Sequence, residues 1–241
     1  MGAAPGTLAL VGGAEWSPGC VFDADLLERS GSTHVVVLPT AAAYERPDAK
    51  VASAARWFSG LGAEVEGLMV LSRSDAQNRG LCRVVREARF VYLSGGSSLH
   101  LRSVIKGSAL LEALTQAWFD GAVIAGAGGG AMVLTDPMVD PRGGALTVGL
   151  GLVEGMAVFT HLGDVLEDAH GEKLHRSVAL APEGVPVVGL PEKTAVIRDP
   201  GGQWRAAGAG RPSIFVDGAR RDDGLSGLSR RVRVAASPPG A

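Results

Sequence analysis

Hydrophobic and polar positions follow two alternating patterns along the first half of the chain. Short, nearly continuous apolar runs predict buried strands at 7–12, 34–39, 64–71, 89–94 and 121–125. Stretches of mixed polarity and helical length predict helices at 22–30, 46–60, 74–88 and 108–119. Strands that alternate with helices in this way are typical of a mainly parallel sheet with helices on both faces. We therefore predict an α/β fold, a three-layer sandwich around a mainly parallel central sheet.

The pattern loosens after about residue 145. A Gly-rich stretch at 143–155 predicts a hairpin-like segment, followed by a helix near 163–179 and strands near 186–190, 194–198 and 213–217. We find no internal repeat and no inter-domain linker, and 241 residues are compatible with one domain. The prediction is a single domain over residues 1–235 and a flexible tail over 236–241.

Charge and cysteine content narrow the classes of function. The 23 basic and 25 acidic residues give a net charge of −2, which offers no footprint for nucleic acid or an anionic membrane. No stretch approaches the roughly 20 apolar residues that span a bilayer, and no basic leader precedes the first apolar run. Cys20 and Cys82 have neither metal-site nor disulfide spacing. We expect a cytoplasmic protein with no metal, no other cofactor, and no nucleic-acid or membrane partner.

The most informative segment is 123–134, which reads Val-Ile-Ala-Gly-Ala-Gly-Gly-Gly-Ala-Met-Val-Leu. Its small residues suit a strand that turns sharply into a helix, as in a nucleophile elbow. The spacing of Gly126, Gly128 and Ala131 also fits the loose dinucleotide-binding pattern. However, the loop follows the fifth predicted strand, and no acidic residue lies about 20 positions later to bind a ribose. Close helix–strand packing is a third explanation, and the residues alone leave all three open.

Segments on both sides of this loop resemble one family. They are Leu10-Val-Gly-Gly13, Val35-Val-Val-Leu-Pro-Thr40, Tyr92-Leu-Ser-Gly-Gly96, Thr135-Asp-Pro-Met138, Gly149-Leu-Gly-Leu152, His161 and Glu192-Lys-Thr-Ala195. In this order, over residues 7 to 217, they resemble the peptidase E and cyanophycinase family of serine hydrolases. The resemblance implies a class I glutamine amidotransferase-like sandwich with flavodoxin-like topology. It places the elbow at the carboxyl edge of the sheet.

The resemblance also implies roles for individual residues. The nucleophile position falls on Gly128, the catalytic histidine on His161 and the triad acid on Glu192. The family has serine at the first of these, and glycine has no Oγ that could lose a proton to the imidazole. The pocket and oxyanion-hole positions fall on Gly95, Gly96, Ser97, Ser98 and Gly129, with Ser97 and Ser98 where the family has Asn-Gln.

The chain departs from the cyanophycinase pattern around the histidine as well. Asp-Gln before the histidine is replaced by Phe159 and Thr160. Arginines after it are replaced by Asp164, Glu167 and Asp168. A pocket that exchanges arginines for carboxylates does not favour an anionic substrate. We therefore expect cyanophycin and aspartyl dipeptides to be poor substrates.

Three hypotheses for function follow. The first is a pseudo-hydrolase that keeps the histidine and the acid, lacks the nucleophile, and binds a small peptide- or amide-like ligand or a partner. The second is an active serine-type omega- or dipeptidase or amidohydrolase. It would use a displaced nucleophile (Ser94, Ser97 or Ser98) or a water activated by His161, or Gly128 would be an engineered change. The third is a nucleotide-binding module that uses the loop 126–131. Assembly as a homodimer stays open.

Overall fold

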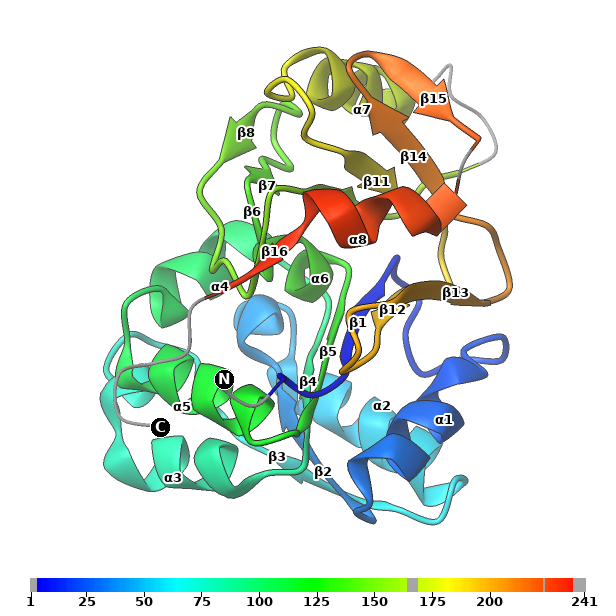
Figure 1. The fold of residues 1–241 in the computed structure, drawn as a ribbon. Coiled ribbons are helices and arrows are strands. Elements are labelled where there is room, and N and C mark those ends of the chain that lie inside the picture. Colours follow the sequence, from blue (N-terminus) through cyan, green and yellow to red (C-terminus); the bar gives the residue numbers. More distant parts are fainter. Residues whose placement is uncertain (1–3, 164–168, 223, 236–241) are drawn as a thin grey trace.

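The computed structural model describes residues 4–163, 169–222 and 224–235, and its centre is a seven-stranded sheet (Figure 1). The strands are β1 (Leu8–Val11), β2 (His34–Leu38), β3 (Glu64–Gly67), β4 (Phe90–Leu93), β5 (Val123–Ala127), β12 (Thr194–Arg198) and β13 (Trp204–Gly208). They lie in the order β13-β12-β1-β5-β4-β2-β3. Strands β1 to β5 are parallel, whereas β12 is antiparallel to both of its neighbours. The predicted mainly parallel sheet is confirmed.

Helices cover both faces of this sheet. Helices α1 (Phe22–Ser30) and α2 (Pro47–Ser59) lie on one face, and α3 (Arg79–Glu87) and α5 (Ala109–Phe119) lie on the other (Figure 1). Successive side chains of a strand point to opposite faces. Accordingly, Leu8 and Leu10 belong to one buried cluster, while Ala9 and Val11 belong to the other. The side chains of β1 therefore contribute to two hydrophobic cores, one on each face of the sheet. The predicted three-layer α/β sandwich is confirmed.

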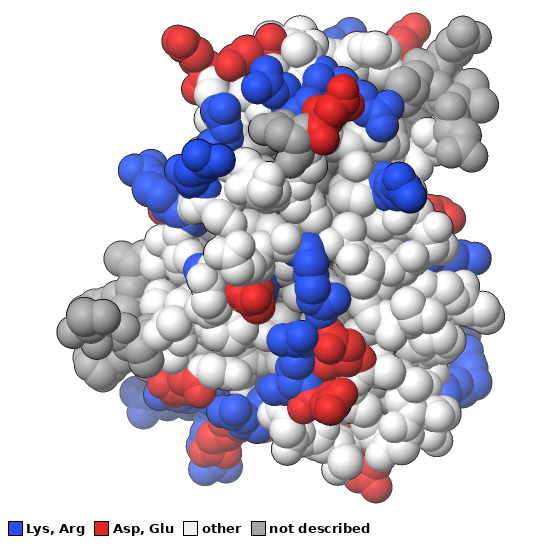
Figure 2. All heavy atoms as spheres, turned by 45° about the vertical axis from the view of Figure 1, so that its right-hand side comes forward, with Lys and Arg blue, Asp and Glu red and all other residues white. Residues whose placement is uncertain are grey.

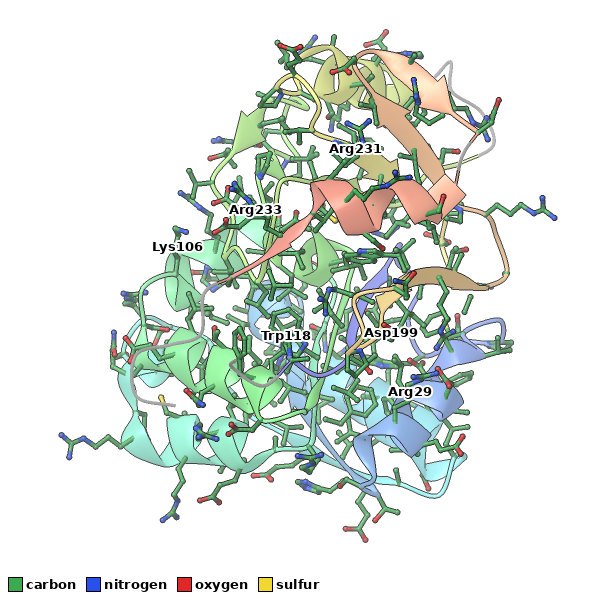
Figure 3. All side chains as sticks on the ribbon, viewed as in Figure 1. Arg29, Lys106, Trp118, Asp199, Arg231 and Arg233 are labelled. Atoms are coloured by element: carbon green, nitrogen blue, oxygen red, sulfur yellow. The ribbon has the colours of Figure 1, made fainter. Side chains whose placement is uncertain are left out.

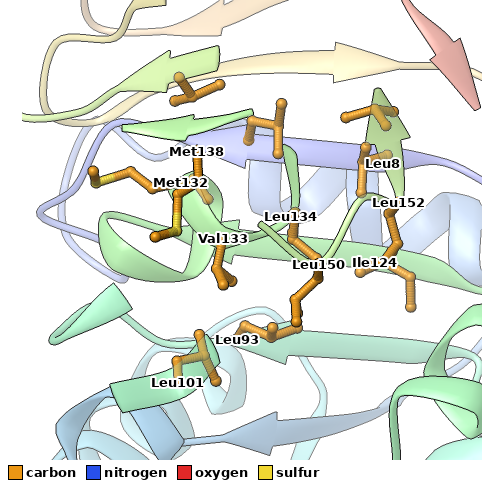
Figure 4. Packing of buried hydrophobic residues seen from close by; sticks show 14 of the residues in the cluster. Leu8, Leu93, Leu101, Ile124, Met132, Val133, Leu134, Met138, Leu150 and Leu152 are labelled. Atoms are coloured by element: carbon orange, nitrogen blue, oxygen red, sulfur yellow. The ribbon is translucent and has the colours of Figure 1, made fainter. Parts of the chain in front are cut away.

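The larger core encloses the short helix α6 (Gly129–Val133), which follows β5 directly. Its last turn packs among aliphatic side chains of the strands and of the loop after residue 149 (Figure 4). Leu93, Ile124 and Leu134 in this group are fully buried. Trp118 of α5, labelled in Figure 3, is also fully buried and donates its indole N–H to the Gly6 carbonyl at 2.8 Å. The start of α6 therefore rests on a rigid part of the molecule.

The second half of the chain forms smaller sheets and further helices (Figure 1). One sheet contains β10 (Ala157–Phe159), β11 (Val187–Gly189), β14 (Ser213–Val216) and β15 (Ala219–Arg221) in that order. The others contain β6 (Thr135–Asp136), β9 (Val153–Glu154) and β16 (Arg233–Val234), and the pair β7 (Met138–Val139) and β8 (Leu146–Thr147). The helices are α7 (Ala169–Ala179) and α8 (Leu228–Arg231), preceded by the 3-10 turn η3 (Gly224–Gly227). Across the described ranges, no helix has the length and apolar character needed to cross a bilayer.

The structure corrects several predicted boundaries. The strand predicted at 64–71 ends at Gly67, and the helix predicted at 74–88 is divided into η2 (Asp75–Gln77) and α3. The division occurs because the side chain of Asn78 accepts hydrogen bonds from Gly80 and Leu81 N–H, which starts a new helix. The hairpin expected at 143–155 is instead formed by β7 and β8, which lie closer in sequence to the turn at Gly128. Part of the helix predicted at 163–179 lies outside the described residues.

Several helical segments were not predicted, among them the short α8 and one longer helix. Helix α4 (Ser98–Ile105) follows the loop after β4, and η1 (Thr40–Ala42) follows β2. The Oγ of Ser97 accepts a hydrogen bond from His100 N–H at 3.2 Å and caps α4. Serine at the N-cap is a recognised helix start signal. The sequence prediction used Ser97 only as a pocket residue and therefore missed the helix.

Asp23 is a buried acid on the inner face of α1. Its Oδ2 accepts a hydrogen bond from the Trp57 indole at 2.9 Å, and its Oδ1 has no hydrogen-bond partner within the described structure. Burial raises the pKa of Asp23 to about 8; the Trp57 hydrogen bond opposes this rise and the charge of Glu15 adds to it. The carboxyl group is therefore neutral in the folded protein at neutral pH.

The raised pKa of Asp23 predicts a pH-dependent stability. Between the ordinary aspartate pKa near 4 and the folded value of about 8, the folded protein binds one proton more than the unfolded chain. The free energy of unfolding should fall as pH rises, by up to about 1.4 kcal/mol per pH unit, with the contribution gone above pH 8. Urea unfolding from pH 5 to 9 should show a smaller fall for Asp23→Asn, which keeps an acceptor for Trp57. Equal slopes for the two proteins would contradict the prediction.

Candidate functional site

Gly128 forms the turn between β5 and α6 at the carboxyl end of β5. Its backbone angles are φ 50° and ψ −118°, a combination that residues with a side chain rarely adopt. Its N–H donates to the Val11 carbonyl at 2.9 Å, and its own carbonyl accepts from Ala131 and Met132 N–H. The turn is therefore held on both sides. It has the strained strand-to-helix geometry that the sequence predicted for position 128.

The glycines around this turn are needed for two different reasons. A Cβ would lie 2.5 Å from a backbone oxygen at Gly126, 2.2 Å at Gly129 and 2.4 Å at Gly130. Side chains cannot fit at these three positions unless the backbone moves. At Gly128 the nearest atom to an added Cβ is Nε2 of His161, at 3.2 Å. Close packing thus explains three glycines, and the fourth stands where a side chain would point at the imidazole.

His161 lies on the loop after β10 and pairs with Glu192. Its Nδ1 is 3.1 Å from Oε1 of Glu192, the hydrogen-bond reach that we expected for this pair. A carboxylate can only accept, so Nδ1 carries a proton, and in the neutral imidazole the lone pair is then on Nε2, which faces Gly128. The two side chains are 49% and 55% exposed, so water has access to the pair.

The backbone of Gly12 and Gly13, just after β1, joins the loops that carry this pair. The Gly12 carbonyl accepts from His161 N–H at 2.8 Å, and the Gly13 carbonyl accepts from Lys193 N–H at 2.9 Å. The Gly12 N–H donates to the Thr194 carbonyl at 2.9 Å. A Cβ on Gly13 would lie 2.3 Å from Cε1 of His161, so glycine is needed for the ring to lie there. The sequence analysis used these glycines only as part of the resemblance, and their contacts come from the structure.

Glu15 is a second functional candidate that the sequence analysis missed. Its side chain is 6% exposed, and Oε1 accepts from Gly95 N–H at 2.9 Å and from Lys50 Nζ at 3.2 Å. The carboxylate therefore fixes the start of the loop 95–98. No motif spacing marks Glu15, because its two partners are 35 and 80 residues away.

Four of the five predicted pocket residues line one cavity of about 270 Å³, namely Gly96, Ser97, Ser98 and Gly129. His161 lines it as well, and Met132, Val139 and Phe159 supply apolar wall. The charged side chains at the cavity are Glu45, Asp140 and Lys173. No arginine is among the described residues that line it. Asp164, Glu167 and Asp168, predicted to replace the family's arginines, lie outside the described residues.

The fifth predicted pocket residue, Gly95, lines a second hollow. This hollow has a volume of about 690 Å³ and includes Glu15, Arg46 and Lys50. Gly96, Glu45 and His161 border both hollows. The imidazole therefore stands between two spaces that a ligand can enter.

The three serines considered as displaced nucleophiles have other roles or surroundings. Ser94 is buried and donates to the Gly95 carbonyl at 3.3 Å, and Ser97 caps α4. Ser98 Oγ is buried and has no hydrogen-bond partner within the described part of the chain. In the same part, no hydrogen bond joins any of these hydroxyls to His161, and no group of three or more His, Cys, Asp or Glu side chains could hold a metal ion.

Comparisons with known proteins show the family and the fold to which the chain is related. The model of the family described as Peptidase family S51 matches residues 12–203. Cyanophycinases of Synechococcus elongatus and Thermosynechococcus vestitus are each 27% identical over 218 residues, covering 87% of this chain and 67% of theirs. A crystal structure of a peptidase from an acI-B1 Actinobacterium aligns with a TM-score of 0.81 and 26% identity, covering 92% of this chain and 95% of that one. A putative peptidase E of Listeria monocytogenes EGD-e, 15% identical with a TM-score of 0.61 over 86% of this chain and 100% of that one, shares the fold.

Alanine substitutions can separate the two reasons for which this loop contains glycine, which are close packing at Gly130 and the unusual backbone conformation at Gly128. Gly130→Ala places a Cβ 2.4 Å from the Leu93 carbonyl oxygen, whereas Gly128→Ala meets backbone strain of about 1–3 kcal/mol and a 3.2 Å contact with the half-exposed ring of His161, which can shift. We expect Gly130→Ala to lose more unfolding free energy than Gly128→Ala in urea denaturation, although alanine is the better helix former. An equal or larger loss for Gly128→Ala would contradict this account of the turn.

Proposed function

The chain belongs to peptidase family S51, and on that premise we propose that it binds a small peptide- or amide-like ligand at the elbow without forming an acyl-enzyme. In this proposal it is a pseudo-hydrolase with respect to serine chemistry. His161 and Glu192 keep the arrangement of a base and its orienting acid, but position 128 supplies no hydroxyl.

The observation that carries the proposal is the direction of the missing side chain. A Cβ on Gly128 would lie 3.2 Å from Nε2 of His161, so a serine there would bring its Oγ within reach of the imidazole. Acyl transfer needs that oxygen as the nucleophile, and the hydroxyls of Ser94 and Ser98 are buried. The site therefore retains the base while it lacks the group on which the base would act.

The chemistry of the cavity supports the class of ligand. Apolar walls with a few polar groups are typical of sites for small organic ligands. Carbonyl and N–H groups of a short peptide or amide can pair with Lys173 and with the imidazole of His161 at its border. Because no arginine is among its described lining residues, it lacks the bidentate donor that usually holds a carboxylate.

The charge distribution on the surface and the free cysteines support two further parts of the proposal, which are that the protein has no nucleic-acid partner and that it is cytoplasmic. On the face in Figure 2, basic and acidic side chains are interspersed, whereas nucleic-acid sites gather basic groups. Cys20 and Cys82 are free thiols, which favours a reducing compartment, and we propose the cytoplasm. The nucleotide-binding alternative is less favoured, because close packing accounts for three of the four glycines in the loop.

The matched variants Gly128→Ser and Gly128→Ala test the proposal directly. Both add a Cβ in the same strained conformation, so both should lose about 1–3 kcal/mol of unfolding free energy. Only the serine variant gains an oxygen beside Nε2 of His161. We expect a serine-directed phosphonate to label Gly128→Ser at position 128 and to leave Gly128→Ala and the parent protein unlabelled, as measured by intact mass and peptide mapping.

Two results would overturn the proposal. If Gly128→Ser folds and takes up no label, position 128 is not a nucleophile position. If the parent protein is labelled at Ser94, Ser97 or Ser98, a displaced serine is active and the chain is a hydrolase. Adding His161→Ala to the serine variant serves as a control, because labelling through the imidazole should then be lost.

We also expect negligible hydrolysis of aspartyl dipeptides and of cyanophycin by the parent protein. The missing Oγ and the lack of arginines among the described residues that line the 270 Å³ cavity are independent reasons. Turnover should stay far below roughly 1 per second, the lower end of ordinary enzyme rates. Release of free aspartate at or above that rate, measured by amino-acid analysis, would refute both the proposal and this assignment of the pocket.

A further inference from the structure

We propose that the His161–Glu192 pair activates a small nucleophile supplied from solution, water first, at the place where the side chain of residue 128 is missing. The protein would then hydrolyse activated acyl esters by direct attack, with no covalent intermediate. This inference rests on the proposed function, because it uses the same elbow and the same cavity.

The space beside Nε2 suits a molecule of this size. Apart from Gly128 and its chain neighbours, the described residues place two atoms within 4 Å of an added Cβ on Gly128, Nε2 of His161 at 3.2 Å and Cα of Gly95 at 3.6 Å. A free water cannot occupy the Cβ position, which is one bond length from Cα of Gly128, but it can stand beyond that carbon, where no side chain covers Nε2. Because His161 borders both hollows, a water there can come within hydrogen-bond reach of Nε2, which is the requirement for general-base catalysis.

The imidazole is held in the required orientation by contacts that do not involve residue 128. The carboxylate of Glu192 keeps the proton on Nδ1, and the N–H of His161 donates to the Gly12 carbonyl. The ring lies against Gly13, where a Cβ would be 2.3 Å from Cε1. Nε2 therefore faces the elbow whether or not a side chain stands there.

Access for both reactants is also present. His161 is 49% exposed and borders both hollows, so water can reach Nε2 while an acyl group enters from either side. In the reaction, the water oxygen bonds to the acyl carbon while its proton moves to Nε2. The bond from that carbon to the leaving oxygen then breaks, and the imidazolium returns its proton to the leaving group or to solvent. Ester and water thus give an acid and an alcohol.

The same geometry sets which acyl compounds react. A tethered serine benefits from an effective molarity of 10⁵ M or more, and a free water does not. A positioned base still contributes about 10²- to 10⁴-fold. We therefore expect turnover only where the leaving group is good, as in aryl esters, and not with peptides or alkyl amides.

The experiment uses 4-nitrophenyl acetate with the full chain. His161→Ala should lower the hydrolysis rate above buffer by about 100-fold or to the buffer rate. His34→Ala is the matched control, since it removes an exposed imidazole 3.4 Å from Glu66 at the start of β2, far from the carboxyl edge. It should retain the parent rate. Gly128→Ala, which fills the proposed place, should also lose activity.

Hydroxylamine supplies a second measurement that does not depend on a variant. If the nucleophile enters from solution, the rate of ester loss above a protein-free control with the same hydroxylamine should rise in proportion to hydroxylamine, with acetohydroxamate formed, and this protein-dependent rise should vanish in His161→Ala. Activity that persists in His161→Ala, or an acetyl group mapped to Ser94, Ser97 or Ser98, would overturn the inference. If Gly128→Ser is labelled by the phosphonate but the parent shows no His161-dependent rate, only this inference falls. If Gly128→Ser is not labelled, the proposed function falls.

Discussion

The hydrogen bonds of Gly12 and Gly13 hold the site together, because they connect the loop of His161 to the turn that carries Glu192. These glycines follow β1, which pairs with β5 on one side and with β12 on the other. Val11 is in register with Ala127 and with Ala195, so the elbow and the acid arrive at the same edge of the sheet. The distance from Gly128 to the imidazole is therefore set by strand register, with backbone groups rather than flexible side chains as the connection.

This construction explains how the His161–Glu192 pair can be held without a side chain at position 128. No contact that orients His161 passes through a side chain at position 128. The turn is likewise fixed by backbone hydrogen bonds, from Gly128 N–H to Val11 and from Ala131 and Met132 to the Gly128 carbonyl. A glycine at position 128 is compatible with all of these interactions and avoids the backbone strain of about 1–3 kcal/mol that a residue with a side chain would have there.

Much of the fold and part of the site could be predicted from the sequence. The boundaries of α1 at 22–30 and of β12 at 194–198 agree with the prediction, since each has a complete local pattern. The position of the turn at Gly128 was predictable because only small residues allow such close approach. The sequence did not predict which strands belong to the central sheet and which to the β10-β11-β14-β15 sheet. A hydrophobic pattern indicates that a strand is buried, but it does not identify the strands with which it pairs. Glu15 was also beyond prediction, because its role depends on a contact with Gly95 across 80 residues.

The pairing of β12 with β1 has a consequence for synthesis of the chain. Among the strands of the central sheet, β1 (Leu8–Val11) is synthesised first; it is fully buried and pairs with β5 on one edge and β12 on the other. Until residues 194–198 have emerged, one edge of this apolar strand is unpaired, and unpaired apolar edges are where nascent or truncated chains associate wrongly. At about 5–20 residues per second, the 182 residues between the two strands correspond to roughly 10–40 s of exposure. Chains that stop before Glu192 and β12 therefore lack one member of the His161–Glu192 pair. They also leave the edge of β1 exposed, which lies inside the complete central sheet.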